Sequence, residues 1–287
     1  PQTAFEARIL SKSNSYVEMD WIARWSQKDR NIFCVAHDIT ERKEAERLKQ
    51  ELFAMVSHDL RSPLTSVSMT LEMLDDGILG TLNERGSKLA GSAYASVKSL
   101  MILINDLLES EKMAHLGMVL DYEETDMATI VQQAIDYVTP EANSKNIELV
   151  IEGTCKIGQV DSEKIRRVLV NLLGNAIKFS TKGSTVTTLL NDLPNAINRA
   201  DAIEIKVIDE GPGIPADKQA LVFEKFKQAG HKDEGEKKGS GLGLSICKAI
   251  VEAHGGSIGV TSEPNGPGSV FWFRIPLAPL AAAVKTT

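Results

Sequence analysis

The stretch FAMVSHDLRSPL, residues 53–64, places His58 in the middle of a strongly helical segment that runs from Thr40, its predicted N-cap, to about Asp76. Apolar side chains recur there at three- and four-residue spacing, which predicts one long amphipathic helix. They are Leu48, Leu52, Met55, Leu60, Leu64, Val67, Leu71 and Leu74. Pro63 lacks an N–H and crowds the carbonyl four residues before it, so we expect a bend just past His58 that exposes the imidazole.

A second helix is predicted over residues 84–112, after a glycine-containing break at residues 77–83. Its apolar stripe consists of Leu89, Ala93, Val97, Leu100, Ile104 and Leu107. Two such helices joined by a short loop form an antiparallel hairpin. The hairpin contains no further helix that could cover these two apolar stripes, so we expect a homodimer in which two hairpins form a four-helix bundle. Packing of the stripes on the following domain is the alternative.

The segments on either side of the hairpin contain strands. Upstream, apolar runs at residues 4–10, 16–25 and 31–37 predict three antiparallel strands. Downstream, Asp126 and Asp161 are candidate N-caps of two helices, and further strands and helices follow in mixed order up to about residue 276. We therefore expect a multidomain α and α+β chain, divided at residues 1–40, 41–117, 118–278 and a flexible tail at 279–287.

Composition excludes several function classes. The net charge of −7 argues against a nucleic-acid-binding protein, and no apolar run is long enough for a membrane span. Cys34, Cys155 and Cys247 lie far apart without metal-ligand spacing, which indicates reduced thiols and a cytoplasmic location. A membrane anchor of the full-length protein would lie upstream.

His58 and its neighbours form the first candidate site. A neutral imidazole is a competent nucleophile near neutral pH, and Asp59 is placed to orient it or take its proton. The string resembles the phospho-acceptor box of sensor histidine kinases, commonly F…SHELRTPL. This resemblance implies that His58 accepts a phosphoryl group and that Asp59 assists. Ser62 corresponds to the residue that positions a hydrolytic water in family members that also act as phosphatases.

A second candidate site is the string NLLGNAIKF at residues 171–179. Its spacing places Asn171, Asn175 and Lys178 on one helix face, opposite a face of buried leucines, and a solvated polar face is the plain alternative. The string resembles the N-box of the ATP-binding domain of the same family. The resemblance implies that Asn175 binds Mg²⁺, that Asn171 supports the metal, that Lys178 reaches a phosphate of ATP, and that Phe179 flanks the adenine.

Two glycine-rich strings complete the candidate nucleotide site. The first, DEGPGIP at residues 209–215, resembles the first glycine box of the family, in which the aspartate corresponding to Asp209 binds the adenine amino group. The second, KGSGLGL at residues 238–244, resembles the second glycine box, and FEKF at residues 223–226 resembles the F-box. Residues 227–238 resemble the ATP lid, and for a phosphate contact of Lys237 or Lys238 a solvated charge run is the plain alternative. The implied nucleotide-binding residues are Gly211, Gly213, Ile214, Phe226, Lys238, Gly239, Ser240, Gly241, Leu242, Gly243 and Leu244.

The string VAHDITER at residues 35–42 resembles the motif that ends PAS domains. This implies that the first strands belong to a PAS sheet, that Asp38 and Thr40 tie the sheet to the helix of His58, and that an upstream sensory domain is a partner.

Together these resemblances imply a kinase that uses Mg-ATP to phosphorylate its own His58 and then passes the group to an aspartate of a response regulator receiver domain. They imply a dimeric helical hairpin followed by an α/β sandwich of the histidine kinase, gyrase and heat-shock ATPase type. One rival is an ATP-hydrolysing conformational machine, but those enzymes usually place a catalytic glutamate where this chain has Asn171. The second rival is a scaffold that dimerises without catalysis.

Overall fold

The computed structural model describes residues 2–12, 14–116, 118–197, 200–227, 241–262 and 268–278. By its contacts the chain divides into two compact units, Pro1–Met101 and Ile102–Thr287, which are described separately. The boundary falls inside a helix.

The first unit opens with a three-stranded antiparallel sheet of β1 (Gln2–Leu10), β2 (Tyr16–Ser26) and β3 (Asn31–Asp38), in the order β1-β2-β3. These strands match the predicted runs. In this register Phe5 lies opposite Trp21, and their rings stack.

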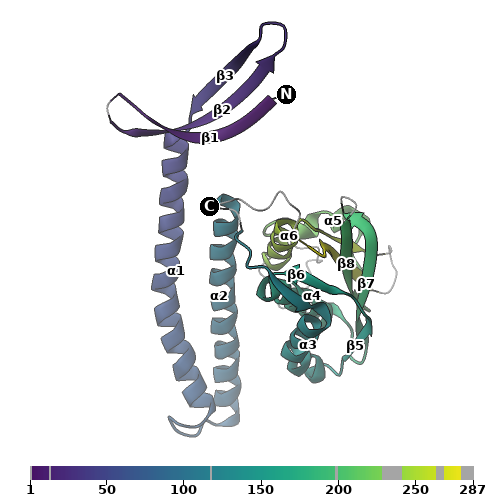
Figure 1. The fold of residues 1–287 in the computed structure, drawn as a ribbon. Helices are drawn as coiled ribbons and strands as arrows, with labels where there is room; N and C mark the ends of the chain where they lie inside the picture. The colour runs from purple at the N-terminus through teal and green to yellow at the C-terminus, as the bar shows by residue number, and fades with distance from the viewer. Residues whose placement is uncertain are drawn as a thin grey trace. The chain divides into compact units, whose positions relative to one another are not determined.

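Helix α1 (Thr40–Asp75) follows the sheet directly and is one unbroken helix through Pro63 (Figure 1). The predicted N-cap was wrong by one residue, because Ile39 is the capping residue and Thr40 is already helical. Asp38 performs the capping function instead: its carboxylate accepts a hydrogen bond from the Thr40 N–H at 2.9 Å. The Thr40 hydroxyl in turn accepts a hydrogen bond from the Glu18 N–H at 3.0 Å, so these two residues tie the sheet to the helix as expected.

Helix α2 (Glu84–Leu116) runs back antiparallel to α1 after the loop at residues 76–83, which confirms the hairpin. Much of the predicted apolar stripe is exposed in the single chain. In α1 the exposed members are Leu48, Leu52, Met55, Leu60 and Val67, and in α2 they include Leu89 and Leu100.

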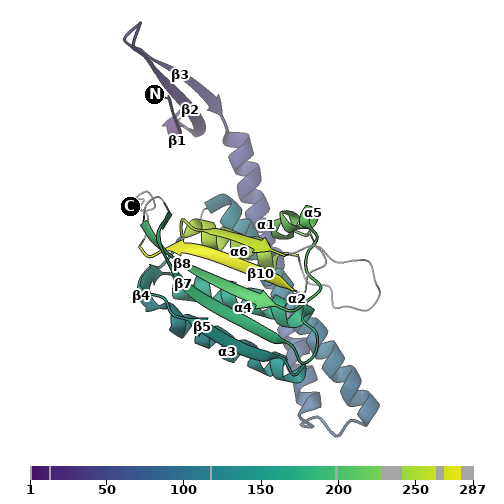
Figure 2. The same ribbon diagram turned by 90° about the vertical axis from the view of Figure 1, so that its right-hand side faces the viewer.

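The second unit contains a five-stranded mixed sheet with helices on one of its faces (Figure 2). The strand order is β5-β7-β8-β10-β9, in which only the β5–β7 pair is parallel. The strands are β5 (Glu148–Gly153), β7 (Thr185–Ile197), β8 (Ala200–Asp209), β9 (Ser257–Thr261) and β10 (Ser269–Pro276). A small two-stranded sheet, β4 (Glu123–Asp126) with β6 (Ile157–Val160), was not predicted.

The helices of this unit are α3 (Met127–Ser144), α4 (Ser162–Phe179), the short α5 (Ala216–Gln219), a 3₁₀ turn at Leu221–Phe223, and α6 (Gly243–Ala253). Both predicted caps are confirmed, because Asp126 accepts from the Ala128 N–H and Asp161 from the Lys164 N–H.

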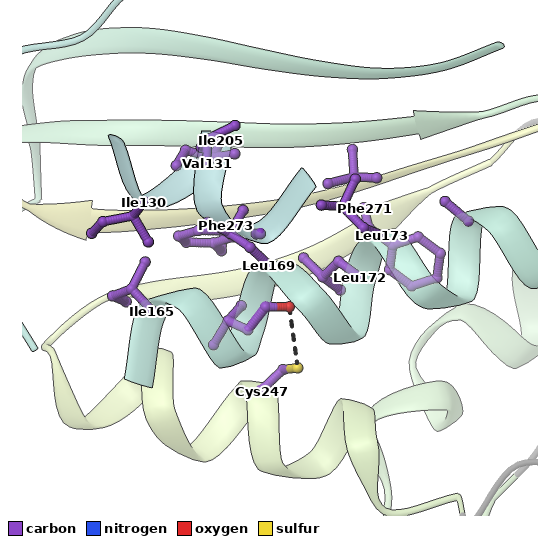
Figure 3. Close-up of a cluster of buried hydrophobic side chains, with 14 of the residues drawn as sticks. Ile130, Val131, Ile165, Leu169, Leu172, Leu173, Ile205, Cys247, Phe271 and Phe273 are labelled. Atoms are coloured by element: carbon purple, nitrogen blue, oxygen red, sulfur yellow. Dashed lines mark hydrogen bonds between the residues drawn. The ribbon is translucent and has the colours of Figure 1, made fainter. Parts of the chain in front are cut away.

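The core of the second unit lies between the helices and the sheet (Figure 3). Helix α4 contributes Ile165, Leu169, Leu172 and Leu173, all fully buried, and β10 contributes Phe273. Each buried side chain of this size contributes about 1.5–3 kcal/mol of transfer free energy. Because the core fixes this face of α4, the polar side chains on the opposite edge of the helix are held in a defined orientation.

Candidate functional site

His58 lies in α1 with its imidazole open to solvent, the side chain being 81% exposed. Its Nδ1 atom is 3.2 Å from Asp59 Oδ1. In the tautomer that carries its proton on Nδ1, this hydrogen bond leaves the lone pair of Nε2 free for nucleophilic attack. Ser62 is exposed one helical turn later.

The polar edge of α4 carries the second set of predicted residues. Asn171, Asn175 and Lys178 are each half-buried, while the leucines between them are fully buried, as the spacing predicts. Phe179 ends the helix with 46% of its surface exposed, and the Lys178 ammonium lies 5.0 Å from the centre of its ring. The final turn of α4 therefore presents an aromatic face beside a cation.

Asp209, the last residue of β8, is buried, with 5% exposure. Its Oδ1 accepts backbone N–H groups from Gly211 at 2.8 Å and from Ser269 at 3.1 Å. Burial raises the pKa of this carboxyl, and the two backbone hydrogen bonds oppose the rise. Neither hydrogen bond uses Oδ2, so that atom can accept a hydrogen bond from a ligand.

The first glycine turn is packed tightly against Asp209 and α4. A Cβ on Gly211 would lie 2.9 Å from both Asp209 Oδ1 and the Phe179 carbonyl oxygen, so only glycine fits. Gly213 has a positive φ of 76°. At the end of the turn, the Ile214 N–H donates to Ser262 Oγ at 2.9 Å.

The second glycine turn meets α4 near the middle of the helix, at Asn171. A Cβ on Gly243, the first residue of α6, would lie 2.8 Å from Asn171 Oδ1. Gly241 has a φ of 68° and packs on Phe226, whose N–H donates to the Gly241 carbonyl at 2.9 Å. Phe226 is 64% exposed, whereas Leu242 is buried and Leu244 packs on the core.

The structure thus brings the predicted residues of the second unit together along one edge of α4. Asn171 meets the second glycine turn, and Phe179 meets the first glycine turn and, through it, Asp209. Lys238, Gly239 and Ser240, with most of the predicted lid, lie outside the described residues. His58, Asp59 and Ser62 belong to the first unit.

Three residues that hold this edge in place were missed at the sequence level. Ser262 and Gln219 brace the first glycine turn, since Gln219 Nε2 donates to the carbonyls of Ile214 at 3.0 Å and of Ser262 at 2.8 Å. Lys145 donates to carbonyls at the end of α4. These contacts join residues 5 to 43 positions apart, and no local pattern indicates them.

Comparison with known proteins identifies the two regions separately. Residues 48–116 match the His Kinase A (phospho-acceptor) domain, and residues 160–279 match the histidine kinase-, DNA gyrase B- and HSP90-like ATPase family. The adaptive-response sensory kinase SasA of Crocosphaera subtropica is 31% identical over 94% of this chain and 69% of its own length. The chain belongs to the sensor histidine kinase family.

Other members of the sensor histidine kinase family share parts of this chain. The alginate biosynthesis sensor protein KinB of Pseudomonas aeruginosa is 32% identical over 85% of this chain, which spans only 39% of KinB. Among solved structures, full-length ShkA in complex with AMPPNP has a TM-score of 0.65 at 27% identity, covering 82% of this chain and 47% of ShkA. The histidine kinase ThkA in complex with the response regulator TrrA shares the fold, with a TM-score of 0.56 at 23% identity and coverage of 96% and 79%.

The arrangement fits a nucleotide with a hard metal ion. The amide oxygens of the half-buried asparagines on α4 are the kind of ligand that Mg²⁺ accepts, and the start of α6 supplies backbone N–H groups suited to phosphate. Gly243 lies so close to Asn171 that any larger residue at position 243 would fill the space beside the Asn171 amide. No helix among the described residues has the length and apolar character that crossing a membrane requires.

Proposed function

We propose that this chain is a protein-histidine kinase that phosphorylates its own His58 from Mg-ATP and then transfers the phosphoryl group to an aspartate of a response regulator receiver domain. The observation that carries the proposal is the pairing of His58 with Asp59, which leaves Nε2 as an exposed nucleophile. Both residues lie within the region that matches the phospho-acceptor domain.

In the proposed reaction, His58 Nε2 attacks the γ-phosphorus of ATP. An N–P bond forms, the bond from the γ-phosphorus to the β–γ bridging oxygen breaks, and ADP leaves. Asp59 accepts the Nδ1 proton of the imidazole as positive charge develops on the ring. Bound Mg²⁺ supplies neutralisation of phosphate charge.

The roles in the second unit are assigned by chemistry. Asp209 offers a buried acceptor for the adenine amino group, which penalises bases that lack this amine. Asn175 is the proposed magnesium ligand, supported by Asn171, and Lys178 is the proposed phosphate contact. The two glycine turns let the nucleotide approach the backbone.

The proposed partners follow from the hairpin. A second copy of this chain would cover the exposed stripe of α1 and α2 in a four-helix bundle. The response regulator is the proposed acceptor, and an upstream PAS sensory domain is the proposed source of the signal. The phosphatase role of Ser62 is part of the same proposal.

Incubation with γ-labelled ATP and Mg²⁺ tests the proposal. We expect the protein to acquire a label that is labile to acid and stable to base, and we expect none in His58→Ala. The matched control is His37→Ala, which removes another exposed histidine on β3 and should label normally. Label on His58→Ala would contradict the proposal. Phosphate release without labelled protein would instead support an ATP-hydrolysing machine.

A further inference from the structure

Lys145 contacts the end of α4 from a different part of the chain. Its ammonium donates to the carbonyl oxygen of Ile177 at 2.8 Å and approaches that of Lys178 at 3.3 Å. The two contacts span 32 and 33 residues, from the α3–β5 turn to the final turn of α4. This final turn carries Lys178 and Phe179.

The carbonyls that Lys145 contacts would otherwise lack helical partners. The last four carbonyls of an α-helix have no N–H group of the same helix to bind. Here the Ser180 N–H serves the Ala176 carbonyl, and Lys145 serves the next two. A positive charge is also favourable at this end because the helix dipole is negative there.

Lys145 is itself held firmly. It is the C-cap residue of α3, and the Ile147 N–H closes the turn by donating to the Ala142 carbonyl at 3.0 Å. Asn146 takes up a positive φ of 55°, and Ile147 is buried at 4% exposure. The backbone of Lys145 is therefore fixed by the turn from which its ammonium reaches α4.

The same turn of α4 also packs against the first glycine turn, residues 209–215. The Phe179 carbonyl lies against Gly211 so closely that no Cβ fits between them, and Gly211 is hydrogen-bonded to Asp209. Both Lys145 and the first glycine turn therefore contact the final turn of α4. A shift of this turn would move Lys178 and Phe179 relative to Asp209.

We propose that Lys145 is a positioning residue of the ATP site: it holds the final turn of α4 so that Lys178 and Phe179 face the nucleotide bound at Asp209. This inference rests on the proposed function, since it assigns a role within the same nucleotide site. Lys145 does not touch the nucleotide in this account and acts through the α4 backbone.

The test compares Mg-ATP affinities of purified variants by titration calorimetry, at a temperature where each variant is fully folded by circular dichroism. Lys145→Met removes the charge and the donors, and we expect it to weaken ATP binding about tenfold, because small displacements of positioning groups have effects of this order or larger. Lys145→Arg keeps a cation that reaches the carbonyls and should bind within about threefold of wild type.

The matched control is Lys156→Met, which removes a lysine that forms an exposed pair with Asp201 at 3.4 Å. It should leave ATP affinity unchanged. A purely structural role of Lys145 would lower the unfolding midpoint of Lys145→Met and leave its ATP affinity at the wild-type value once folded, and that result would overturn the proposal. Should Lys145→Met not fold, Lys145→Gln, with a shorter neutral side chain, takes its place with the same expected loss of affinity and the same overturning result.

Failure of the inference is distinguishable from failure of the proposed function. Wild-type protein that does not bind Mg-ATP would refute the nucleotide site itself. Wild-type protein that binds, together with a folded Lys145→Met that binds equally well, would refute only the role of Lys145.

Discussion

The carboxylate of Asp209 accepts a hydrogen bond from the backbone N–H of Ser269 at 3.1 Å, across 60 residues of sequence. This contact joins the end of β8 to the start of β10, where the two residues are paired in the sheet. With Gly211 as second donor to the same oxygen, the carboxylate has one oxygen fixed by the backbone, while its other oxygen takes part in neither of these hydrogen bonds. The sheet therefore sets the orientation of the Asp209 carboxylate, which we propose binds the adenine amino group.

Asp209→Asn should separate folding from nucleotide binding. The amide oxygen can keep both backbone hydrogen bonds, so we expect the domain to fold. The amide nitrogen would then replace Oδ2 and place a donor against the adenine amino group, which is itself a donor. We expect Mg-ATP affinity to fall about 100-fold, consistent with a buried polar mismatch of about 2–3 kcal/mol. Asp201→Asn, at an exposed carboxylate that pairs with Lys156, is the control and should bind normally.

The raised pKa of Asp209 also predicts a pH dependence. Between its ordinary value of 3.8 and the raised folded value, the native state holds a proton that the unfolded state has lost, so this group's contribution to stability falls as the pH rises through that window. Binding of ATP has the opposite dependence, because the ionised carboxylate is the form that accepts from adenine. We expect calorimetric ATP affinity to fall as the pH is lowered through the raised pKa. An affinity that is flat down to the unfolding pH would contradict the assigned role.

His254 predicts a second pH effect, on stability alone. It is buried, its Nε2 accepts from the Asp161 N–H at 3.1 Å, and its Nδ1 lies 2.8 Å from the Ile250 carbonyl, which requires the neutral ring with its proton on Nδ1. Burial lowers its pKa from 6.5, and the hydrogen bond to the Ile250 carbonyl and the charge of Asp161 only partly offset this. In the unfolded chain His254 takes up a proton as the pH falls below about 6.5, while the folded ring stays neutral. The contribution of His254 to the free energy of unfolding is therefore fully present above that pH and declines below it.

Urea unfolding at pH 8, 7, 6 and 5 measures this effect. The free energy of unfolding should decline from pH 7 to pH 5 in wild type and decline less in His254→Phe. That variant should also be about 1–3 kcal/mol less stable at pH 8, because the Asp161 N–H and the Ile250 carbonyl lose a partner. His37→Ala removes an exposed histidine and should keep the wild-type slope. Equal slopes in all three proteins would show that His254 is not responsible.

Local signals in the sequence predicted much of this fold and site, whereas contacts between distant residues were not accessible to them. Asp126 and Asp161 were recognisable as caps because the N–H groups they accept from lie two and three residues later. Strand β4 was missed because EETD has no apolar alternation and owes its conformation to pairing with β6. Strand β7 likewise continues through an irregular register to Ile197 because it pairs with β8, a strand that local signals cannot bring to it.

The same distinction applies to the site. Residues such as Asn175 and Asp209, to which we assign roles in nucleotide binding, stand in short recognisable strings. The bracing contacts of Lys145, Gln219 and Ser262 come from other elements, and their residue types are ordinary for surface turns. The spacing of Asn171, Asn175 and Lys178 correctly placed them on one helix edge, but only the packing of Gly243 and Gly211 shows what that edge faces.

Ser262→Ala should destabilise the second unit. The Ser262 hydroxyl donates to the Gly268 carbonyl at 2.9 Å and accepts from the Ile214 N–H at 2.9 Å, so it bridges the first glycine turn and the residue that precedes β10. Its loss leaves both backbone groups without this partner, at a cost of about 1–3 kcal/mol in the free energy of unfolding. Ser257→Ala, at an exposed position of β9, is the control and should change stability by less than about 0.5 kcal/mol. Equal urea midpoints for the two variants would contradict the bridging role.

Leu52→Lys should dissociate the proposed dimer without affecting the nucleotide site. Leu52 is 55% exposed in the single chain and lies one turn from Leu48, which is 61% exposed, on the stripe that a second hairpin would cover. A lysine there would be buried without a partner in the bundle, which is costly, but would be solvated in a monomer. We expect sedimentation velocity to show a dimer for wild type and a monomer for Leu52→Lys, with ATP affinity unchanged. Val35→Lys, at an exposed position of β3, should remain dimeric, and a wild-type chain that sediments as a monomer at every concentration would exclude the four-helix bundle.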